Sequence, residues 1–339
     1  MRNALVELGF DEYIRREFGK LAGMTPEQRI GRVSRIDRGW STYRCSTIAT
    51  MGDAAPLLEC RVRNLANDVA VGDWIVVSAD GEKIVSVLPR RSRLVRRSSS
   101  EDSPAEAQVI AANVDVIFLV HALDGELNQR RLERELVLAF DSGARPVVLL
   151  TKSDTVGADE IVAARAMVEV SSPGVTVHVV SSVTGEGLTD LRRDVRNGTT
   201  AVVLGASGAG KSTLINALTG TDSQETGEVR TGDKRGRHTT TAVDLVALPD
   251  HGWLIDTPGV RTVGLWTSGH GIERAFADIF RLADDCRFRD CKHEQEPACA
   301  VLSAIAAGSL DARRLEAMRR LVAEEAALEK EQRRAQKRR

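Results

Sequence analysis

A glycine-rich stretch from Gly205 to Thr213, with the sequence GASGAGKST, fits the Gly-x4-Gly-Lys-Ser/Thr pattern of a phosphate-binding loop. It follows the apolar run 199–204 and precedes the helix-like segment 213–220, which is the strand, loop and helix context that the motif requires. Glycines let the backbone bend until successive N–H groups and the positive end of the following helix point at phosphate oxygens. The alternative, a glycine-rich turn beside an ordinary exposed lysine, is disfavoured because the match is complete and correctly flanked. The stretch therefore predicts a nucleotide-binding site.

Side chains in and after this loop predict how the phosphates are held. Lys211 places a positive charge between the outer phosphates, and the Ser212 hydroxyl supplies an oxygen ligand for Mg²⁺. Asp256 ends the apolar run 253–256, where its carboxylate can hold Mg²⁺ through water, and the N–H of Gly259 can meet a γ-phosphate. The loop residues predicted to bind the phosphates are Gly205, Ala206, Ser207, Gly208, Ala209, Gly210, Lys211, Ser212 and Thr213.

A second motif, upstream of the first, predicts which base is bound. Its residues, which follow the apolar run 146–150, are Thr151, Lys152, Ser153 and Asp154. An aspartate at a strand end can accept two hydrogen bonds from the N1–H and amino group of guanine, a donor pair that adenine lacks. The wrong base would leave the carboxylate unpaired, so Asp154 predicts GTP rather than ATP. The next strand-like run ends at Ser181 and Ser182, where a backbone N–H can meet the guanine oxygen.

Three of the five cysteines lie close to a histidine, in the pattern Cys286-x4-Cys291-x-His293-x5-Cys299. Three thiolates and one imidazole are the ligand number and type of a closed tetrahedral structural zinc site. The alternative is three small buried apolar residues and a surface histidine. It is disfavoured because cysteine is scarce elsewhere and the local sequence is highly charged. We predict one structural zinc ion, which stabilises a small C-terminal domain of low apolar content.

Strand-like and helix-like runs alternate through the part of the chain that must position these motifs. A buried strand is predicted over 109–123 and a helix over 127–140, and further strands lie at 146–150, 175–180, 199–204, 244–249 and 253–256. This alternation predicts a mostly parallel sheet with helices on both faces. The part of the chain from residue 268 onward is predicted to be mainly helical.

Residues 31–90 have a different texture, with five short alternating segments separated by turn signals. They predict a small closed barrel of the OB type, a fold that often binds single-stranded nucleic acid. A purely structural barrel with solvated arginines is an equal alternative. The residues that could form a basic groove with aromatic platforms are Arg32, Arg35, Arg38, Trp40, Tyr43, Arg44, Arg61 and Arg63.

The remaining segments predict how the domains are joined. Residues 1–30 form an extension whose amphipathic pattern fits a packed helix or a flexible arm, and the arginine-rich segment 90–97 is predicted to be a linker. Apolar residues make up 42% of the 339 and charged residues 28%, as in ordinary globular proteins. No apolar run approaches a membrane span, and the charged start is unlike a secretory signal, so we expect a cytoplasmic protein.

The order of the motifs, with base recognition before the phosphate loop, looks like a circularly permuted GTPase. The wordings DTPGVRTVGLW, GRHTTT and CRFRDCKHEQEPACAV resemble the ribosome small subunit-dependent GTPase family known as RsgA, over nearly the whole chain. The resemblance implies an α/β multidomain protein that acts late in small-subunit maturation, with GTP hydrolysis stimulated by the subunit. Its expected parts are an extension (1–30), an OB barrel (31–90), a permuted GTPase domain (91–267) and a helical zinc domain (268–339).

Two departures from related patterns bear on the mechanism. The family commonly has Asn where this chain has Thr151, whose shorter hydroxyl side chain cannot bridge as an amide does. Val260 follows Gly259 where Ras-type GTPases place a water-orienting Gln, a substitution that the family shares. We therefore predict that His238 orients the attacking water, the alternative being a solvated or RNA-contacting histidine.

The predicted catalytic residues are His238, Lys211 and Thr240. The hydroxyl of Thr240, or that of its neighbour Thr239, is expected to reach Mg²⁺ when the polar segment 234–241 closes over the nucleotide. The expected partners are GTP or GDP, the small ribosomal subunit and its rRNA, and we expect a monomer with no membrane contact. Two other functions remain open. A P-loop ATPase or nucleotide kinase would be indifferent to guanine, and an RNA-binding zinc protein would bind nucleotide without significant turnover.

Overall fold

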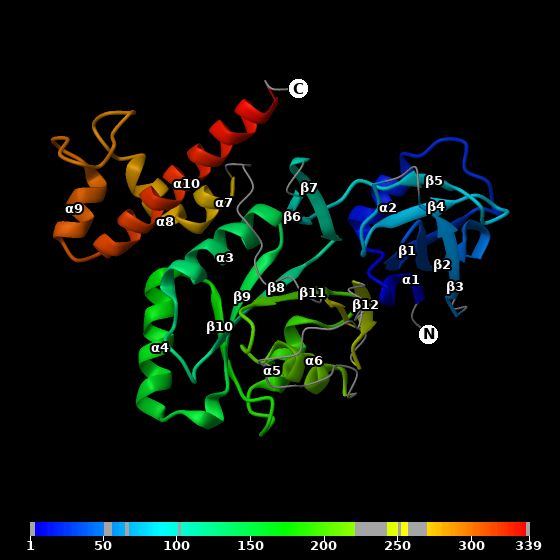
Figure 1. The fold of residues 1–339 in the computed structure, drawn as a ribbon, viewed down its shortest axis with the longest axis horizontal. Helices are drawn as coiled ribbons and strands as arrows, with labels where there is room; N and C mark the ends of the chain where they lie inside the picture. The colour runs from blue at the N-terminus through cyan, green and yellow to red at the C-terminus, as the bar shows by residue number, and fades with distance from the viewer. Residues whose placement is uncertain are drawn as a thin grey trace.

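The computed structural model describes residues 4–50, 56–64, 68–100, 103–220, 243–249, 252–256 and 270–336. Figure 1 shows an antiparallel group of strands in blue and cyan, a central sheet with helices in green and yellow, and a helical group in orange and red. The mixed sheet with helices and the helical C-terminal region confirm these parts of the predicted fold class.

The central sheet positions the nucleotide motifs. Its strands, in spatial order, are β10 (Thr176–Val180), β9 (Arg145–Thr151), β8 (Val116–Ala122), β11 (Thr200–Gly205), β13 (Trp253–Asp256) and β12 (Asp244–Ala247). The first five are parallel, and β12 pairs antiparallel with β13. The predicted mostly parallel sheet is therefore confirmed.

Helices cover both faces of this sheet, which explains why its strands are apolar throughout. The helices are α3 (Gln129–Ser142), α4 (Ala158–Ser171), α5 (Leu188–Asp194) and α6 (Lys211–Thr219). Successive residues of β8 face opposite sides, so Ile117 packs in one apolar cluster with α3 and Phe118 packs in another with α5 and α6. Both side chains are fully buried.

The antiparallel group contains β1 (Arg29–Asp37), β2 (Trp40–Thr47), β3 (Leu58–Arg63), β4 (Trp74–Val77) and β5 (Ile84–Val87). They pair in the order β3-β2-β1-β4-β5, and β12 joins β1 opposite Arg35, which makes this group continuous with the central sheet. No β3–β5 pairing occurs among the described residues, so closure of the OB barrel stays a prediction.

The N-terminal extension forms two short helices, α1 (Ala4–Glu7) and α2 (Glu12–Gly19), packed on the antiparallel group. Leu5 and Leu8 are fully buried, and the ring of Phe10 meets that of Trp74 edge-on at 5.2 Å. The packed helix, rather than the flexible arm, is therefore the correct alternative.

The predicted linker at 90–97 is wrong. The chain instead forms a hairpin of β6 (Arg93–Ser100) and β7 (Ser103–Ala112), in which Leu94 is buried. Arg90 bonds the fully buried Asp73 at 2.8 Å, so its charge is used in folding. The single strand predicted over 109–123 is likewise two strands, because the chain turns at Asn113 with a φ of +54°.

The C-terminal helices are α7 (His270–Ala275), α8 (Ala277–Ala283), α9 (Ala300–Ala306) and α10 (Ala312–Gln336). A Cβ on Gly271 would lie 2.5 Å from the Val137 carbonyl oxygen, so only glycine allows α7 to pack so closely on α3. Phe276 and Leu315 share one apolar cluster with Leu136 of α3. The helical group therefore has no separate core. Within the described ranges, no helix combines the length and apolarity needed to cross a membrane.

Candidate nucleotide and metal sites

The phosphate loop, residues 205–213, connects β11 to α6 and requires its glycines. A side chain on Gly205, with a φ of +157°, would meet the Val120 carbonyl oxygen at 2.4 Å, and Gly210 is left-handed with a φ of +84°. Lys211 begins α6, and its Nζ donates to the carbonyl oxygens of Gly205 (2.9 Å) and Ala206 (2.5 Å). The lysine therefore lies within the loop, where a phosphate chain would need a positive charge.

The base loop, residues 151–154, begins at the last residue of β9, which β8 separates from β11 in the sheet. Ser181, at the end of β10, donates from its hydroxyl to Oδ1 of the exposed Asp154 at 2.5 Å. The same hydroxyl accepts the backbone N–H groups of Val183 (3.2 Å) and Thr184 (3.1 Å). These bonds hold one carboxylate oxygen of Asp154 and leave the carboxylate as an acceptor for the donor pair of guanine.

Parallel pairing brings these motifs together. The carboxyl ends of parallel strands lie at one edge of a sheet, which is where α/β proteins bind ligands. Asp154, Ser181, Gly205 and Asp256 all follow or end such strands, and the Thr151 hydroxyl donates to the Ala209 carbonyl oxygen at 2.8 Å. Of the other predicted site residues, His238, Thr239, Thr240 and Gly259 lie outside the described residues.

Two acidic side chains support the base loop and were missed by sequence reasoning. Asp124, in the turn after β8, accepts from Lys152 Nζ at 2.6 Å. Glu186 accepts from the buried Ser153 hydroxyl at 3.0 Å. An acidic residue just after a strand end was a usable signal for Asp124, whereas nothing local marks Glu186.

The four residues of the cysteine cluster come together as predicted. Their ligand atoms all lie within 4.8 Å of one another. Cys299 Sγ lies 3.8 Å from Cys286 Sγ and 3.3 Å from His293 Nδ1. Zinc–sulfur bonds of about 2.3 Å place the sulfurs of a tetrahedral site about 3.8 Å apart, so the spacing of Cys286, Cys291, His293 and Cys299 fits a zinc ion.

Neighbouring helices fix the orientation of this cluster. Cys299 caps α9, and its Sγ accepts the Leu302 N–H at 3.4 Å. Arg319 of α10 donates to the carbonyl oxygens of His293 (2.6 Å) and Lys292 (3.0 Å). The loop that carries the ligands is thus tied to helices on both sides, as ordered metal sites require.

The RsgA GTPase family model matches residues 87–266, which include the base loop, the phosphate loop and Asp256. The chain belongs to the RsgA GTPase family. The Small ribosomal subunit biogenesis GTPase RsgA of Streptomyces coelicolor is 45% identical over 329 residues, covering 95% of this chain and 87% of that protein. The protein of the same name from Streptomyces avermitilis is 46% identical over 298 residues, covering 87% and 79%.

Two solved structures have a fold similar to that of this chain. YjeQ from Thermotoga maritima superimposes with a TM-score of 0.63 at 25% identity, over 88% of this chain and 99% of that one. YloQ, described as a circularly permuted GTPase, gives a TM-score of 0.64 at 22% identity, over 88% and 96%. The permuted order inferred from the motifs is therefore confirmed as the fold of this RsgA-family chain.

The structure sorts the residues proposed for a nucleic-acid groove. Arg32 is buried and donates to carbonyl oxygens of three separate segments, and burial lowers its pKa to about 10. Tyr43 is buried, and Arg35 pairs with Asp244 at 3.2 Å. The guanidinium groups of Arg32 and Arg35 are therefore paired within the fold.

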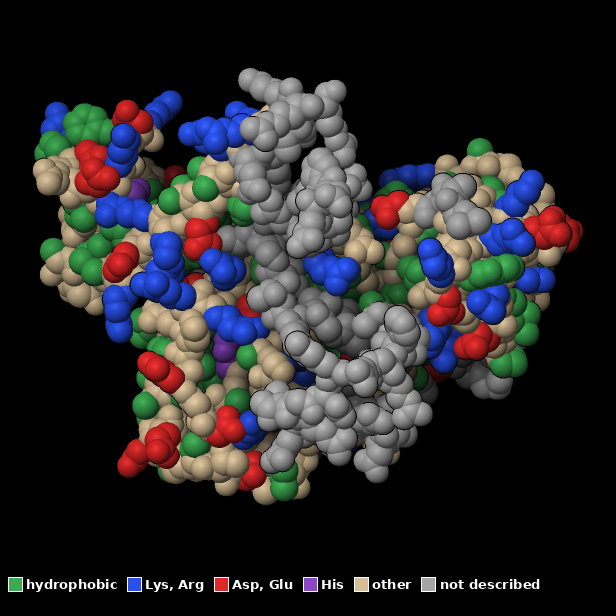
Figure 2. Space-filling view, viewed as in Figure 1, with side chains coloured by type: hydrophobic (Ala, Val, Ile, Leu, Met, Phe, Trp, Pro, Cys, Tyr) green, Lys and Arg blue, Asp and Glu red, His purple; other side chains and the backbone are tan. Residues whose placement is uncertain are grey.

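A smaller surface remains on β2 and β3. The exposed Trp40 ring has the guanidinium groups of Arg61 and Arg63 at 5.3 and 5.2 Å from its centroid. Figure 2 shows basic and acidic side chains mixed over the visible face, so charge alone does not mark a nucleic-acid site. The combination of an exposed indole with two arginines distinguishes this Trp40 surface, since bases stack on aromatic and guanidinium planes.

Proposed function

We propose that this RsgA-family chain binds GTP and hydrolyses it as a switch on the small ribosomal subunit, whose late maturation it assists. The observation that carries the proposal is the arrangement at one sheet edge of Asp154, oriented by Ser181, with Lys211 in the phosphate loop. Together these can recognise guanine and bind phosphates. The relatives named as small ribosomal subunit biogenesis GTPases support the choice of subunit.

The proposal also includes two kinds of metal ion and the division of the chain into domains. Ser212, Thr240 and Asp256 would hold Mg²⁺ with GTP, and the cysteine cluster would hold one structural zinc ion. The N–H of Gly259 would contact the γ-phosphate. We further propose the extension, barrel, GTPase and zinc parts at the boundaries predicted from sequence, in a monomeric cytoplasmic protein that contacts rRNA.

Hydrolysis of GTP and of ATP, each with and without purified small subunits, tests this function. We expect slow GTP turnover that the subunit accelerates, with little ATP turnover. Equal use of ATP would indicate a P-loop ATPase or nucleotide kinase instead. GTP binding without turnover on the subunit would indicate an RNA-binding protein whose nucleotide site does not hydrolyse.

The proposed water-orienting role of His238 rests on sequence, because Val260 follows Gly259 where a glutamine would act in Ras-type GTPases. Substituting His238→Ala should reduce the rate of single-turnover hydrolysis on the subunit by about tenfold to a hundredfold. This effect is at or below the lower end of the range for a general acid or base, because the histidine would only orient the water. GTP affinity and subunit binding should stay unchanged. Wild-type turnover in this variant would remove His238 from the mechanism.

The Trp40 surface is the proposed RNA contact. Trp40→Ala should weaken subunit binding by about fivefold to a hundredfold, the range expected when one stacked base is lost, whereas Trp40→Phe should keep most of the affinity. Arg63→Gln should weaken binding and reduce the slope of log affinity against log salt by about one. Filter binding at several salt concentrations measures both effects.

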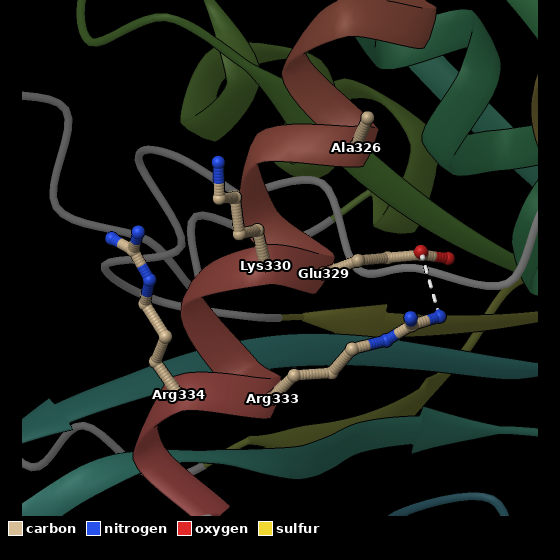
Figure 3. A pocket seen from close by; sticks show the side chains of 5 residues that line it. All are labelled: Ala326, Glu329, Lys330, Arg333 and Arg334. Carbon is tan, nitrogen blue, oxygen red and sulfur yellow. Dashed lines mark hydrogen bonds and ion pairs between the residues drawn. The ribbon is translucent and has the colours of Figure 1, made fainter.

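Arg165→Gln is the matched control, because it removes one exposed positive charge on α4, away from this surface. Its salt slope should equal that of the wild type. Arg91 is not a suitable RNA probe, since it bonds Asp11 and Asp115 within the fold. Figure 3 shows Lys330, Arg333 and Arg334 projecting from α10, and we expect them to contribute a non-specific part of the affinity. Equal binding by Trp40→Ala and wild type would place the RNA elsewhere.

A further inference from the structure

Thr151 joins the base loop to the phosphate loop. Its side chain is 2% exposed, and Oγ1 lies 2.8 Å from the Ala209 carbonyl oxygen and 3.3 Å from that of His121. Ala209 belongs to the phosphate loop, and Thr151 begins the base loop. The hydroxyl of Thr151 therefore connects the two loops of the nucleotide site, which corrects the expectation that a threonine is too short to bridge at this position.

A threonine hydroxyl has only one hydrogen to donate, and both acceptors near Thr151 are backbone carbonyl oxygens. That hydrogen is already used within the protein. An asparagine amide has two N–H donors, so it could bond the phosphate loop and still donate to a base. The residue type thus decides whether the side chain at this position bonds the base in addition to bonding the phosphate loop.

We propose that Thr151 is a positioning residue, which sets the spacing between the base loop and the phosphate loop and does not itself bind guanine. The inference rests on the proposed GTP-binding function. Base selection then depends on Asp154, which faces the N1–H and amino donors of guanine. The N7 acceptor on the opposite edge of the base receives no hydrogen bond from Thr151.

A positioning role predicts a particular pattern of binding losses. GTP spans both loops and gains affinity when their spacing is fixed in advance, whereas guanosine or inorganic triphosphate occupies only one loop. Thr151→Val keeps the shape of the side chain but removes the hydroxyl. It should weaken GTP binding by about tenfold, the equivalent of one hydrogen bond, and change binding of either fragment by less than about twofold.

The experiment measures equilibrium binding of GTP, ATP, guanosine and inorganic triphosphate to the full-length wild type and to Thr151→Val and Thr151→Ser. Thr151→Ser retains the hydroxyl and should restore most of the GTP affinity. A loss of triphosphate binding in Thr151→Val as large as the loss of GTP binding would indicate a damaged phosphate loop and overturn the positioning role. GTP binding equal to that of the wild type would also overturn it.

A guanine nucleotide with carbon in place of N7, 7-deaza-GTP, tests the second half of the proposal. The wild type should bind it within about twofold of GTP, and Thr151→Asn should prefer GTP by about fivefold because its spare N–H can donate to N7. A wild-type preference for GTP that disappears in Thr151→Val would place the hydroxyl on the base and overturn the proposal.

The wild-type comparison of GTP with ATP separates this inference from the proposed function. Equal affinity for the two nucleotides would reject the guanine-selective function itself. A wild type that prefers GTP, combined with unchanged binding in Thr151→Val, would reject only the positioning role.

Discussion

Substituting Asp154→Asn is expected to lower GTP affinity by about a hundredfold or more and to shift preference toward xanthosine triphosphate. Guanine presents two donors, N1–H and the amino group, and an amide cannot accept both hydrogen bonds. Xanthine has a carbonyl oxygen where guanine has the amino group. The new N–H donor of asparagine matches that oxygen, so the substitution exchanges one base for another rather than abolishing the site.

The surroundings of Asp154 make this substitution a clean probe of base recognition. The Ser181 hydroxyl donates to Oδ1 of Asp154, and asparagine keeps an oxygen at that position. The loop after β10 should therefore stay in place, and only the group that faces the base changes. Asp154 is exposed, so the variant should fold with nearly wild-type stability.

Competition of GTP, ATP and xanthosine triphosphate for a fluorescent guanine nucleotide measures the effect. Asp159→Asn is the matched control, because it makes the same chemical change in the exposed first turn of the neighbouring helix α4. It should bind GTP as the wild type does. Unchanged GTP preference in Asp154→Asn would show that this motif does not contact the base.

Local patterns explain why the nucleotide and metal residues could be predicted from sequence. A Cβ on Gly205 would lie 2.4 Å from the Val120 carbonyl oxygen, so the phosphate loop needs glycine there. The contact itself is long-range, but the Gly-x4-Gly-Lys-Ser/Thr pattern that marks it lies within one short segment. The cysteine cluster lies within one short segment, Cys286 to Cys299. The strands that end at these motifs are apolar on both faces, and such runs are readable without knowing their partners.

Long-range pairing explains what could not be predicted. The sequence predicted Arg90 to be part of a solvated linker, yet its partner Asp73 is fully buried and lies directly before β4. Arg32 looked like a nucleic-acid ligand, yet its three acceptors belong to Leu8, Gly72 and Asn113. No local sequence pattern indicates which distant residues an arginine side chain will bond, so these partners can be identified only from the folded structure.

The zinc prediction carries the other large effect. Cys299→Ser should lower zinc affinity by about a hundredfold or more and reduce the bound zinc well below one ion per chain, because a hydroxyl is a poor zinc ligand beside thiolates. Residues 287–298 form no helix or strand, and Phe288 is 42% exposed. We therefore expect zinc coordination to be the main force that orders this segment, and loss of the zinc should expose the segment to proteases.

The consequences should extend beyond the metal loop, contrary to what separate domain cores would give. Cys299 and Val301 are buried in the same apolar cluster as Leu136 of α3, and Arg320 of α10 bonds Glu133 of α3 at 2.5 Å. Loss of zinc should therefore loosen the C-terminal helices and also lower the thermal midpoint of the nucleotide-binding sheet. The strand pairing at the phosphate loop is remote from the cluster, so GTP binding should persist at low temperature.

Elemental analysis, limited proteolysis and thermal unfolding with and without GTP measure these effects together. Cys60→Ser is the matched control, because Cys60 is a half-buried cysteine on β3 and takes no part in the cluster. It should retain one zinc ion and resist cleavage between residues 286 and 299. A Cys299→Ser protein that binds no zinc and resists proteolysis as well as Cys60→Ser would show that helix packing alone orders the loop. The tie from Arg319 to the His293 carbonyl oxygen, and the cap that Cys299 places on α9, would then be sufficient without a metal.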